Sequence, residues 1–223
     1  MFLWAVISVV IKPFTYNPFS TNCYVVSSLG ETVIVDPSCH ADWERDELIE
    51  YIQSTGTQVS RILLTHAHID HIFGCADLSE HFGIGIEVHG EEKVLLEQAA
   101  FQSQMYGIAI KQPPMPVRLI VPGETITFGD ITWSVIHTPG HSPGSVSFLD
   151  VKNGYVLSGD VLFQHSIGRT DLWRGSLPTL MDSIFQNLMP LDDETRVLSG
   201  HGPETTIGEE RENNPFLTDF AGV

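Results

Sequence analysis

The chain has 223 residues, 42% of them hydrophobic, and a formal net charge of −17 at pH 7. This length and apolar content suffice for one large domain, or two small ones, with a sizeable core. The strongly acidic balance disfavours binding to nucleic acid or to an anionic membrane surface, because both partners carry negative charge.

The cysteines and the N-terminal segment indicate the compartment. Cys23, Cys39 and Cys75 form no C-x-x-C pair, and an odd number of cysteines without metal-ligand spacing predicts reduced thiols in a cytoplasmic protein. The apolar start lacks the basic residues and cleavage site of a signal peptide, and it is shorter than the ~20 residues that span a bilayer. We interpret residues 1–8 as a strand extension or a disordered start.

The first half of the chain alternates between strand and helix patterns. The predicted elements are three strands within 9–36, a helix over 42–54, a strand ending at Thr65, a helix to about His81, a strand over 86–89 and a helix over 91–106. In the 42–54 segment, Leu48, Ile49 and Ile52 recur at helical spacing, and Gly56 then ends the helix.

The second half repeats this order of strands followed by helices. The predicted elements are strands over 117–121, 125–128, 132–137 and 145–149, a hairpin turn at Asn153-Gly154, a strand over 155–157, a helix over 177–188 and a strand over 196–198. Strands and helices in this order predict an α/β (α+β) fold with two sheets packed face to face and helices outside.

One stretch, Thr65-His66-Ala67-His68-Ile69-Asp70-His71, contains four potential metal ligands and follows a strand-like apolar run. His66 and His68 are two residues apart in an extended segment, so their side chains point to the same side. Asp70 and His71 follow as the chain turns, and they can face a second point. One loop can therefore supply ligands to two adjacent cations, for which imidazole and carboxylate favour zinc, iron or manganese.

Three later positions offer the ligands that this loop cannot supply alone. His141, Asp160 and His201 each follow a glycine directly, and glycine permits positive φ or close backbone approach in a crowded site. Five further histidines lack this setting and are left out of the predicted site: His40, His81, His89, His137 and His165.

These motifs resemble the metallo-β-lactamase superfamily. The matching elements, in chain order, are Asp36, Thr65 to His71, His141, Asp160 and His201. Within the superfamily the chain looks most like the short, single-domain glyoxalase II (hydroxyacylglutathione hydrolase) branch. The stretches that carry this likeness are Gly159 to Phe163, Ser166 to Leu172, and Asn214 to Leu217. The aspartate at 160, where many lactamases carry cysteine, also favours the hydrolase branch.

The resemblance implies a four-layer αββα sandwich in one domain over residues 1–223, without a separate C-terminal helical domain. It implies two divalent transition-metal ions, zinc before iron or manganese. One ion would be held by His66, His68 and His141, the other by Asp70, His71 and His201, with Asp160 bridging them. Asp36 is expected to orient the ligand loop as a hydrogen-bond acceptor behind the ligands.

The implied activity is hydrolysis of a small acyl thioester of the S-lactoylglutathione type, by attack of a hydroxide held between the two ions. Asp70 and Asp160 would orient this nucleophile. Arg169 and Phe163 are the expected substrate-binding residues, although Arg169 can instead pair with Asp171. Long glyoxalase II enzymes carry an aromatic residue at the position of Asp171 and a C-terminal helical domain that grips glutathione.

Two alternatives remain open at this point. A persulfide dioxygenase would share the scaffold and the Gly168 to Asp171 stretch, but it would use one iron held by His66, His141 and Asp160. The other alternative is a metal-dependent binding or scaffold protein without enzymatic activity, against which the complete ligand set argues. Under the preferred reading, the partner is a small-molecule thioester, with neither nucleic acid nor membrane involved.

Overall fold

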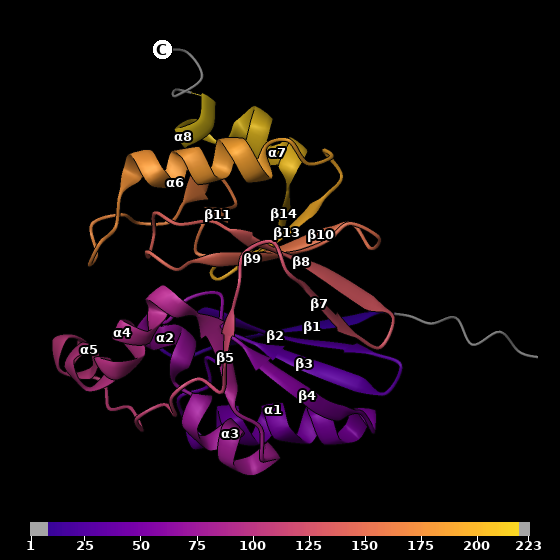
Figure 1. Cartoon of the computed structure of the whole chain (residues 1–223), viewed down its shortest axis with the longest axis vertical. Helices are drawn as coiled ribbons and strands as arrows, with labels where there is room; N and C mark the ends of the chain where they lie inside the picture. The colour runs from indigo at the N-terminus through magenta and orange to yellow at the C-terminus, as the bar shows by residue number, and fades with distance from the viewer. Residues whose placement is uncertain (1–8, 219–223) are drawn as a thin grey trace, which may run out of the picture.

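The computed structural model describes residues 9–218, so the interpretation of residues 1–8 lies outside the described residues. Two six-stranded sheets face each other, and helices cover both outer faces, which gives four layers (Figure 1). The predicted αββα sandwich is confirmed. Within residues 9–218, none of the helices has both the length and the apolar character that crossing a membrane requires.

The first sheet is built from the first half of the chain. Its strands in spatial order are β1 (Val10–Tyr16), β2 (Thr21–Ser28), β3 (Glu31–Val35), β4 (Gln58–Leu63), β5 (Ile86–His89) and β6 (Arg118–Ile120). The first three strands pair antiparallel through short turns. The pairs from β3 to β6 are parallel, and parallel neighbours require crossover connections, which here contain helices.

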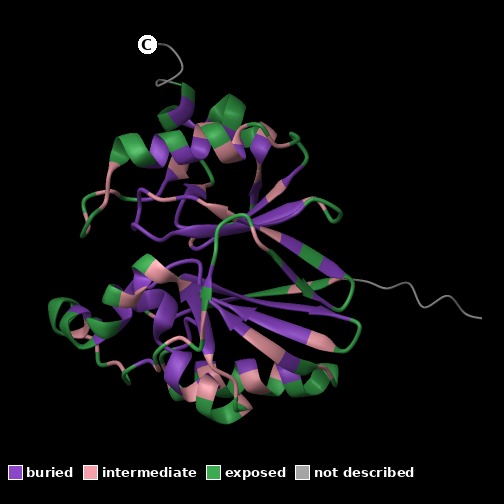
Figure 2. Ribbon diagram, viewed as in Figure 1, coloured by how far each residue is buried: buried purple, intermediate pink, exposed green. Residues whose placement is uncertain are grey.

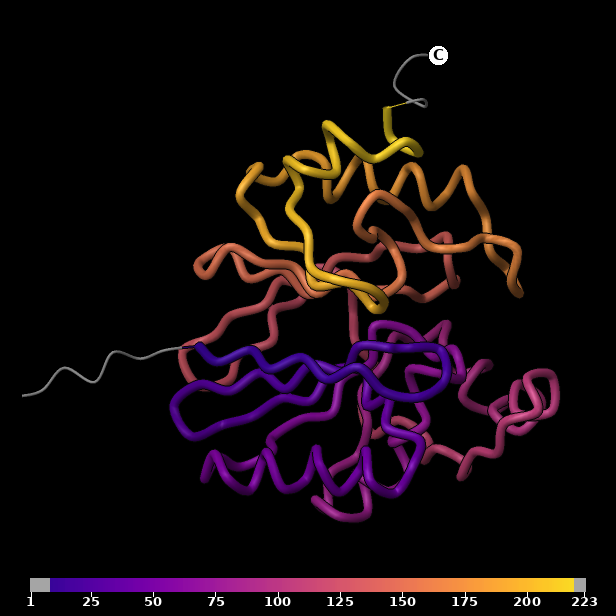
Figure 3. The backbone as a smooth tube through the Cα atoms, turned by 180° about the vertical axis from the view of Figure 1, so that it is seen from behind, coloured from indigo at the N-terminus to yellow at the C-terminus, as the bar shows by residue number. Residues whose placement is uncertain are grey.

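The second sheet is built from the second half. Its strands in spatial order are β14 (Thr205–Thr206), β13 (Arg196–Ser199), β10 (Tyr155–Gly159), β9 (Val146–Asp150), β8 (Ile131–His137) and β7 (Thr125–Phe128). A separate hairpin pairs β11 (Leu162–Phe163) with β12 (Ser166–Ile167). Seen from behind, the two halves of the chain occupy separate halves of the sandwich (Figure 3).

The helices form the outer layers. They are α1 (Asp42–Thr55), α2 (Ile69–Ile72), α3 (Cys75–Phe82), α4 (Lys93–Glu97), α5 (Ala99–Tyr106), α6 (Leu177–Ser183), α7 (Ile207–Asn213) and α8 (Pro215–Thr218). Helices α1 and α3 lie under the first sheet, whereas α6 and α7 lie over the second (Figure 1). A π-helical turn, Ile184–Leu188, continues α6 and completes the predicted apolar stripe.

Side-chain alternation along the strands explains why the sheets are buried on both faces. In β2, Tyr24 and Val26 point into the core between the sheets, whereas Cys23 and Val25 point to the helix side. In the core between the sheets, Trp133 is fully buried, and its Nε1 donates to the Tyr155 hydroxyl at 2.8 Å. Buried residues accordingly fill the middle layers, while exposed residues mark the outer helices (Figure 2).

Two predicted helices are divided in the structure. The helix predicted to end near His81 breaks at Gly74, whose N–H donates to the Pro37 carbonyl at 2.7 Å, and a Cβ there would collide with Cys39. The helix predicted over 91–106 consists of a 3₁₀ turn, Gly90–Glu92, followed by α4 and α5, which meet at Gln98. The short elements β11, β12, β14, α7 and α8 were not predicted.

Candidate metal centre

The loops that carry the predicted ligands meet at one edge of the sandwich. β8, β10 and β13 run in the same direction, because β9 is antiparallel to β8 and β10 while β13 is parallel to β10. Their C-terminal ends therefore share an edge, and the loops that follow contain His141, Asp160 and His201. The loop after β4 comes from the facing sheet, and its Thr65 carbonyl accepts from Val146 N at 2.9 Å.

His66, His68 and His141 form the first group of potential ligands, and all three are buried. His141 Nε2 lies 3.2 Å from His66 Nε2 and 2.8 Å from His68 Nδ1, so three ring nitrogens face one point. Burial lowers the pKa of each imidazole, that of His68 to about 3. Neutral imidazoles have free lone pairs, which is the form that binds a metal ion.

Asp70, His71 and His201 form the second group. Asp70 Oδ2 lies 3.1 Å from His201 Nε2 and 3.5 Å from His71 Nε2. Burial alone would raise the pKa of Asp70, but His71 and His201 outweigh it and lower the pKa to about 2. This aspartate is therefore an ionised acceptor beside two imidazoles.

Asp160 lies between the two groups. Its Oδ1 is 3.3 Å from His71 Nε2, and its Oδ2 is 3.4 Å from His141 Nε2 and 3.4 Å from His201 Nε2. One carboxylate therefore reaches both sets of ring nitrogens, which is the position that a bridging ligand requires.

The ring nitrogens that face away from the centre have their own partners. His66 Nδ1 lies 3.1 Å from Thr65 Oγ1, His141 Nδ1 lies 2.8 Å from the Arg169 carbonyl, and His201 Nδ1 lies 3.1 Å from the Phe19 carbonyl. A carbonyl can only accept, so in His141 and His201 the outward nitrogen carries the proton. In the neutral form of each ring, the inward Nε2 then presents a lone pair.

Asp36 lies behind the ligand loop and contacts three of its groups. Its Oδ1 accepts from Thr65 N at 2.7 Å, and its Oδ2 accepts from Thr65 Oγ1 at 2.6 Å and lies 3.0 Å from His71 Nδ1. Asp36 has a φ of +50°, which is unusual for a residue with a side chain. The carboxylate thus contacts both ends of the ligand loop.

The glycines before the ligands allow close packing. A Cβ on Gly200 would collide with Asp160 Oδ1 and would lie 2.8 Å from His71 Cε1. Gly159 has a φ of +53°, and a Cβ there would lie 2.5 Å from Thr65 Oγ1. Both positions require glycine for the reason that the sequence predicts: the backbone approaches the site too closely for any side chain.

Two buried polar atoms at the centre, His71 Nε2 and Asp160 Oδ1, make no well-aligned hydrogen bond within residues 9–218, although they lie 3.3 Å from each other. Leaving buried polar atoms unpaired costs about 1–3 kcal/mol each, so such atoms need an explanation. Nitrogen and carboxylate oxygen are the donors that zinc and iron prefer. The donor set and its unpaired atoms therefore fit metal ions.

Two buried residues that hold the ligand loop were missed in the sequence. Glu92 Oε2 accepts from Ala67 N at 2.8 Å, while its Oε1 accepts from Ser142 Oγ at 2.8 Å and from Gly144 N at 2.7 Å. Glu92 therefore joins the His66–His68 loop to the loop that contains His141. Its burial raises the pKa of this carboxyl.

Gln102 holds the same loop from α5. Its Oε1 accepts from Ile69 N at 2.9 Å, and its Nε2 donates to the Ala67 carbonyl at 3.2 Å. The signal that could have found both residues is their helical spacing with Leu95 and Ala99, which places two polar side chains on an apolar face. Thr21, whose Oγ1 donates to Asp70 Oδ2 at 2.7 Å, gives no comparable signal.

A cavity of about 310 Å³ opens onto the centre. Both residues predicted to bind substrate line it: Phe163 lies with its ring 6.0 Å from that of His201, and Arg169 lies at the rim. Apart from the ligands and Ser166, the other walls are apolar or aromatic, and Phe19 packs edge-on against Tyr106 with ring centroids 5.4 Å apart. The cavity joins an apolar surface to the cluster of ligands.

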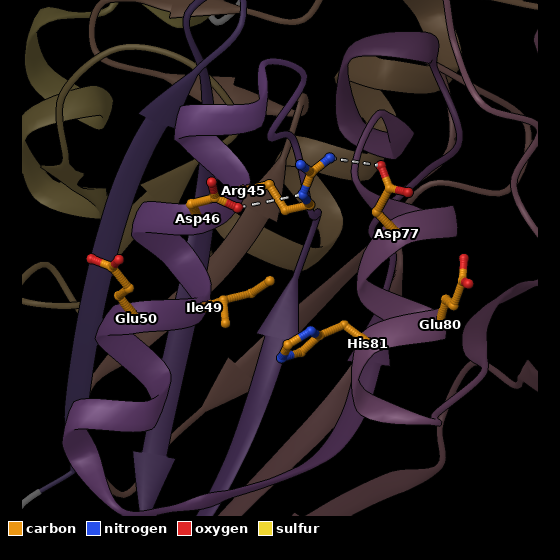
Figure 4. A pocket seen from close by; sticks show the side chains of 7 residues that line it. All are labelled: Arg45, Asp46, Ile49, Glu50, Asp77, Glu80 and His81. Carbon is orange, nitrogen blue, oxygen red and sulfur yellow. Dashed lines mark hydrogen bonds and ion pairs between the residues drawn. The ribbon is translucent and has the colours of Figure 1, made fainter.

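A larger cavity, of about 540 Å³, lies between α1 and α3 on the outer face of the first sheet. Figure 4 shows Arg45 between Asp46 and Asp77, with its guanidinium 3.3 Å from Asp77 and 3.7 Å from Asp46. None of the ligand groups found within residues 9–218 lies in this cavity. Arg45 already pairs with carboxylates there, so the size of a cavity does not mark the functional site in this protein.

The histidines left out of the predicted site lie away from the centre. His81 is exposed, and His165 pairs with Glu209 at 2.8 Å. His89 and His137 approach Glu91 near the surface, where Glu91 is exposed. None of these residues contributes to the two buried groups described above.

Comparison with known proteins agrees with the fold. The chain belongs to the Metallo-beta-lactamase superfamily, whose family model matches residues 16–201. The predicted resemblance is thereby confirmed. Membership, together with the two His/Asp groups, indicates a metal-dependent hydrolase.

Three similar proteins have informative descriptions. Hydroxyacylglutathione hydrolase GloC of Haemophilus influenzae is 36% identical over 202 residues, which cover 89% of this chain and 93% of that protein. The BLEG-1 B3 metallo-beta-lactamase structure has a TM-score of 0.86 at 42% identity. The match covers 94% of this chain and 100% of the BLEG-1 chain. TTHA1623, solved in a di-iron-bound form, has a TM-score of 0.84 at 40% identity. The match covers 92% of this chain and 100% of the TTHA1623 chain.

Proposed function

We propose that the chain is a dinuclear metal-dependent hydrolase that cleaves a small acyl thioester of the S-lactoylglutathione type. The observation that carries the proposal is the position of Asp160 between two complete groups of ligands. The similarity to GloC, which is described as a hydroxyacylglutathione hydrolase, supports the thioester as substrate.

The proposed ligand set contains seven residues, more than one ion uses in a typical protein site. His66, His68 and His141 would hold one ion, and Asp70, His71 and His201 would hold the other, with Asp160 contacting both. The ions are zinc or iron in this proposal: the donors suit both metals, and the similar TTHA1623 is described in a di-iron form.

Bound ions of this kind supply an acidified water that ionises near neutral pH and a positive charge for the carbonyl oxygen. The chain itself positions the reactants. Asp70 and Asp160 present carboxylate oxygens that can hold and orient the attacking water at the centre. The aromatic walls around Phe163 exclude bulk water from the acyl group. A thiolate leaves without a general acid, because free thiols have a pKa of only about 8.5.

The proposal is tested with two assays on the same zinc-loaded and iron-loaded samples. The first measures hydrolysis of S-D-lactoylglutathione under anaerobic conditions. The second measures oxygen consumption with glutathione persulfide. We expect thioester hydrolysis without oxygen, and we expect the metal-free protein to be inactive until an ion is restored.

The persulfide dioxygenase is the alternative that the oxygen assay addresses. It would leave Asp70, His71 and His201 without an ion, and of these the buried His71 Nε2 makes no well-aligned hydrogen bond within residues 9–218, which is costly. Oxygen consumption by the iron form, with no thioester cleavage by either form, would replace our proposal with this alternative.

A third assay covers the activity that BLEG-1's description suggests. Hydrolysis of a chromogenic β-lactam uses the same attack on a carbonyl, and BLEG-1 is described as a B3 metallo-beta-lactamase. We expect kcat/KM for the thioester to exceed that for the lactam. A faster lactam reaction would make lactam hydrolysis the better description of this chain.

A further inference from the structure

The rim of the cavity at the ligand cluster contains one basic side chain. Among residues 9–218, those that line this cavity include Arg169 and no lysine or other arginine. The backbone of Arg169 is fixed beside the centre, since its carbonyl accepts from His141 Nδ1 at 2.8 Å. Its guanidinium is therefore the group best placed to meet an acidic part of a bound thioester.

That guanidinium already has a partner within the chain. Arg169 Nε lies 2.7 Å from Asp171 Oδ1, and Nη2 lies 2.8 Å from Asp171 Oδ2, so the pair is bidentate. Hydrogen bonds from Arg169 lower the pKa of Asp171 to about 2, and Asp171 therefore stays ionised at any working pH. The pair has no net charge, and Asp171 occupies the Nε and Nη2 donors of the guanidinium.

The remaining walls of the cavity are suited to apolar groups. Phe19, Tyr106, Phe163 and Leu172 line it, and they offer aromatic and aliphatic surface. Pockets of this kind bind mainly through apolar contact, with a few polar groups that set orientation. Beyond the metal ligands and Arg169, these walls offer no charge that would attract a carboxylate.

We propose that the site prefers thioesters whose thiol part is uncharged, and that Asp171 sets this preference by occupying Arg169. The inference rests on the proposed thioester hydrolysis. Glutathione carries two carboxylates and one ammonium group, so it is a net anion, and at this rim its carboxylates meet a neutralised arginine in a chain whose net charge is −17. A compact amide-bearing thiol meets no such penalty and can lie along Phe19 and Leu172.

The preference is tested with two substrates that share one acyl group. Kinetics compare S-lactoylglutathione with S-lactoyl-N-acetylcysteamine, whose thiol part is uncharged, for the unaltered protein and for Asp171→Asn. We expect kcat/KM of the unaltered protein to favour the uncharged thioester. Asp171→Asn frees Arg169, so the ratio of kcat/KM for glutathione to that for the uncharged thioester should rise about fivefold, the size of an exposed ion pair.

Two further variants show whether the gain comes from Arg169. Adding Arg169→Gln to Asp171→Asn should abolish the rise in the ratio. Asp182→Asn, which removes an exposed carboxylate from α6, changes the net charge equally and should leave the ratio where it was. The gain should also shrink as salt is raised, since exposed charges are screened over about 10 Å at 0.1 M.

A binding measurement separates this inference from the proposed activity. Calorimetry compares two thioethers that cannot be hydrolysed, S-butylglutathione and S-butyl-N-acetylcysteamine. Asp171→Asn should bind the glutathione thioether more tightly than the unaltered protein does. Failure to hydrolyse either thioester would overturn the proposed activity. An unaltered protein that favours the glutathione compounds, or a ratio that Asp171→Asn does not change, would overturn the role of Asp171.

Discussion

Asp160 Oδ2 lies 3.4 Å from His141 Nε2, across the boundary between the two groups of potential ligands. The other oxygen of the same carboxylate lies 3.3 Å from His71 Nε2. Asp70, in contrast, contacts ring nitrogens of the second group only, at His71 and His201. The two aspartates therefore have different roles, and their variants should differ.

Asp160→Ala should lower metal affinity and activity more than Asp70→Ala does. Removing a bridging carboxylate disturbs both sets of ligands and leaves the repulsion between two ions uncompensated. Even residues that only support a metal ligand contribute about 10–100-fold to metal affinity or activity. We therefore expect the residual activity of Asp160→Ala to be at least about tenfold lower than that of Asp70→Ala. Chelator competition and kcat on reconstituted samples measure this. Equal residual activity in the two variants would contradict the bridging position.

His141→Ala should lose metal and activity, whereas His137→Ala should keep the metal of the buried groups and the activity. His141 faces His66 and His68, but His137 Nε2 lies 3.1 Å from the Pro143 carbonyl, outside the cluster. Elemental analysis and turnover of the two purified variants provide the comparison. Similar losses in both would mean that the ligand has been misassigned.

Glu92→Gln should loosen the two ligand loops that Glu92 joins. The amide can accept with its one oxygen only, so it leaves Ala67 N, or the pair Ser142 and Gly144, facing an NH₂ donor. An unpaired buried donor costs about 1–3 kcal/mol, and we expect a loss of this size in the free energy of unfolding. Thermal unfolding and metal affinity should both decrease.

The matched control for this change is Glu91→Gln, which alters the adjacent carboxylate on the exposed side of the same turn. It should leave unfolding and metal affinity close to those of the unaltered protein. If the two variants behave alike, the hydrogen bonds of Glu92 have no special importance for the ligand loops.

Metal binding should release protons at neutral pH. In the metal-free protein, burial and the neighbouring His71 lower the pKa of His201. Asp160 and Asp70 outweigh both effects and raise this pKa to about 10. His201 is then protonated at pH 7, and an ion must displace that proton. Raising the pH removes the competing proton, so apparent affinity should rise by about tenfold per pH unit for each proton released.

Calorimetry in buffers of different ionisation enthalpy counts these protons directly. We expect at least one proton released per chain on loading at pH 7. Metal affinity that is independent of pH between 6 and 8, or that falls as pH rises, would show that Nε2 of His201 is not displaced from its proton by the ion.

Much of the fold follows from local patterns in the sequence. Residues 42–54 have helical spacing of apolar residues before a terminating glycine, and α1 ends at Thr55 with Gly56 in the left-handed conformation. The ligand candidates share a signal of the same local kind: they are histidines and aspartates in the loops that follow strands, and three of them, His141, Asp160 and His201, are preceded by glycine. Residue type and position suffice to predict that such side chains converge.

The contacts that support the ligand loop depend on tertiary structure, so local sequence patterns do not predict them. Glu92 lies in a turn predicted as ordinary helix, and its partners Ala67 and Gly144 are distant in the chain. The division of the helix at Gly74 depends on Pro37 and Cys39, which approach only in the folded protein. The short pairs β11–β12 and β13–β14 contain too few residues for alternation to mark them.

The central claim is that two ions together support thioester cleavage. The most direct test titrates the metal-free protein with zinc or iron under anaerobic conditions while native mass spectrometry counts the ions and hydrolysis of S-D-lactoylglutathione is followed. We predict that activity rises until two ions are bound per chain and needs no oxygen. Full activity at one ion per chain, or turnover only when oxygen is admitted, would contradict the account.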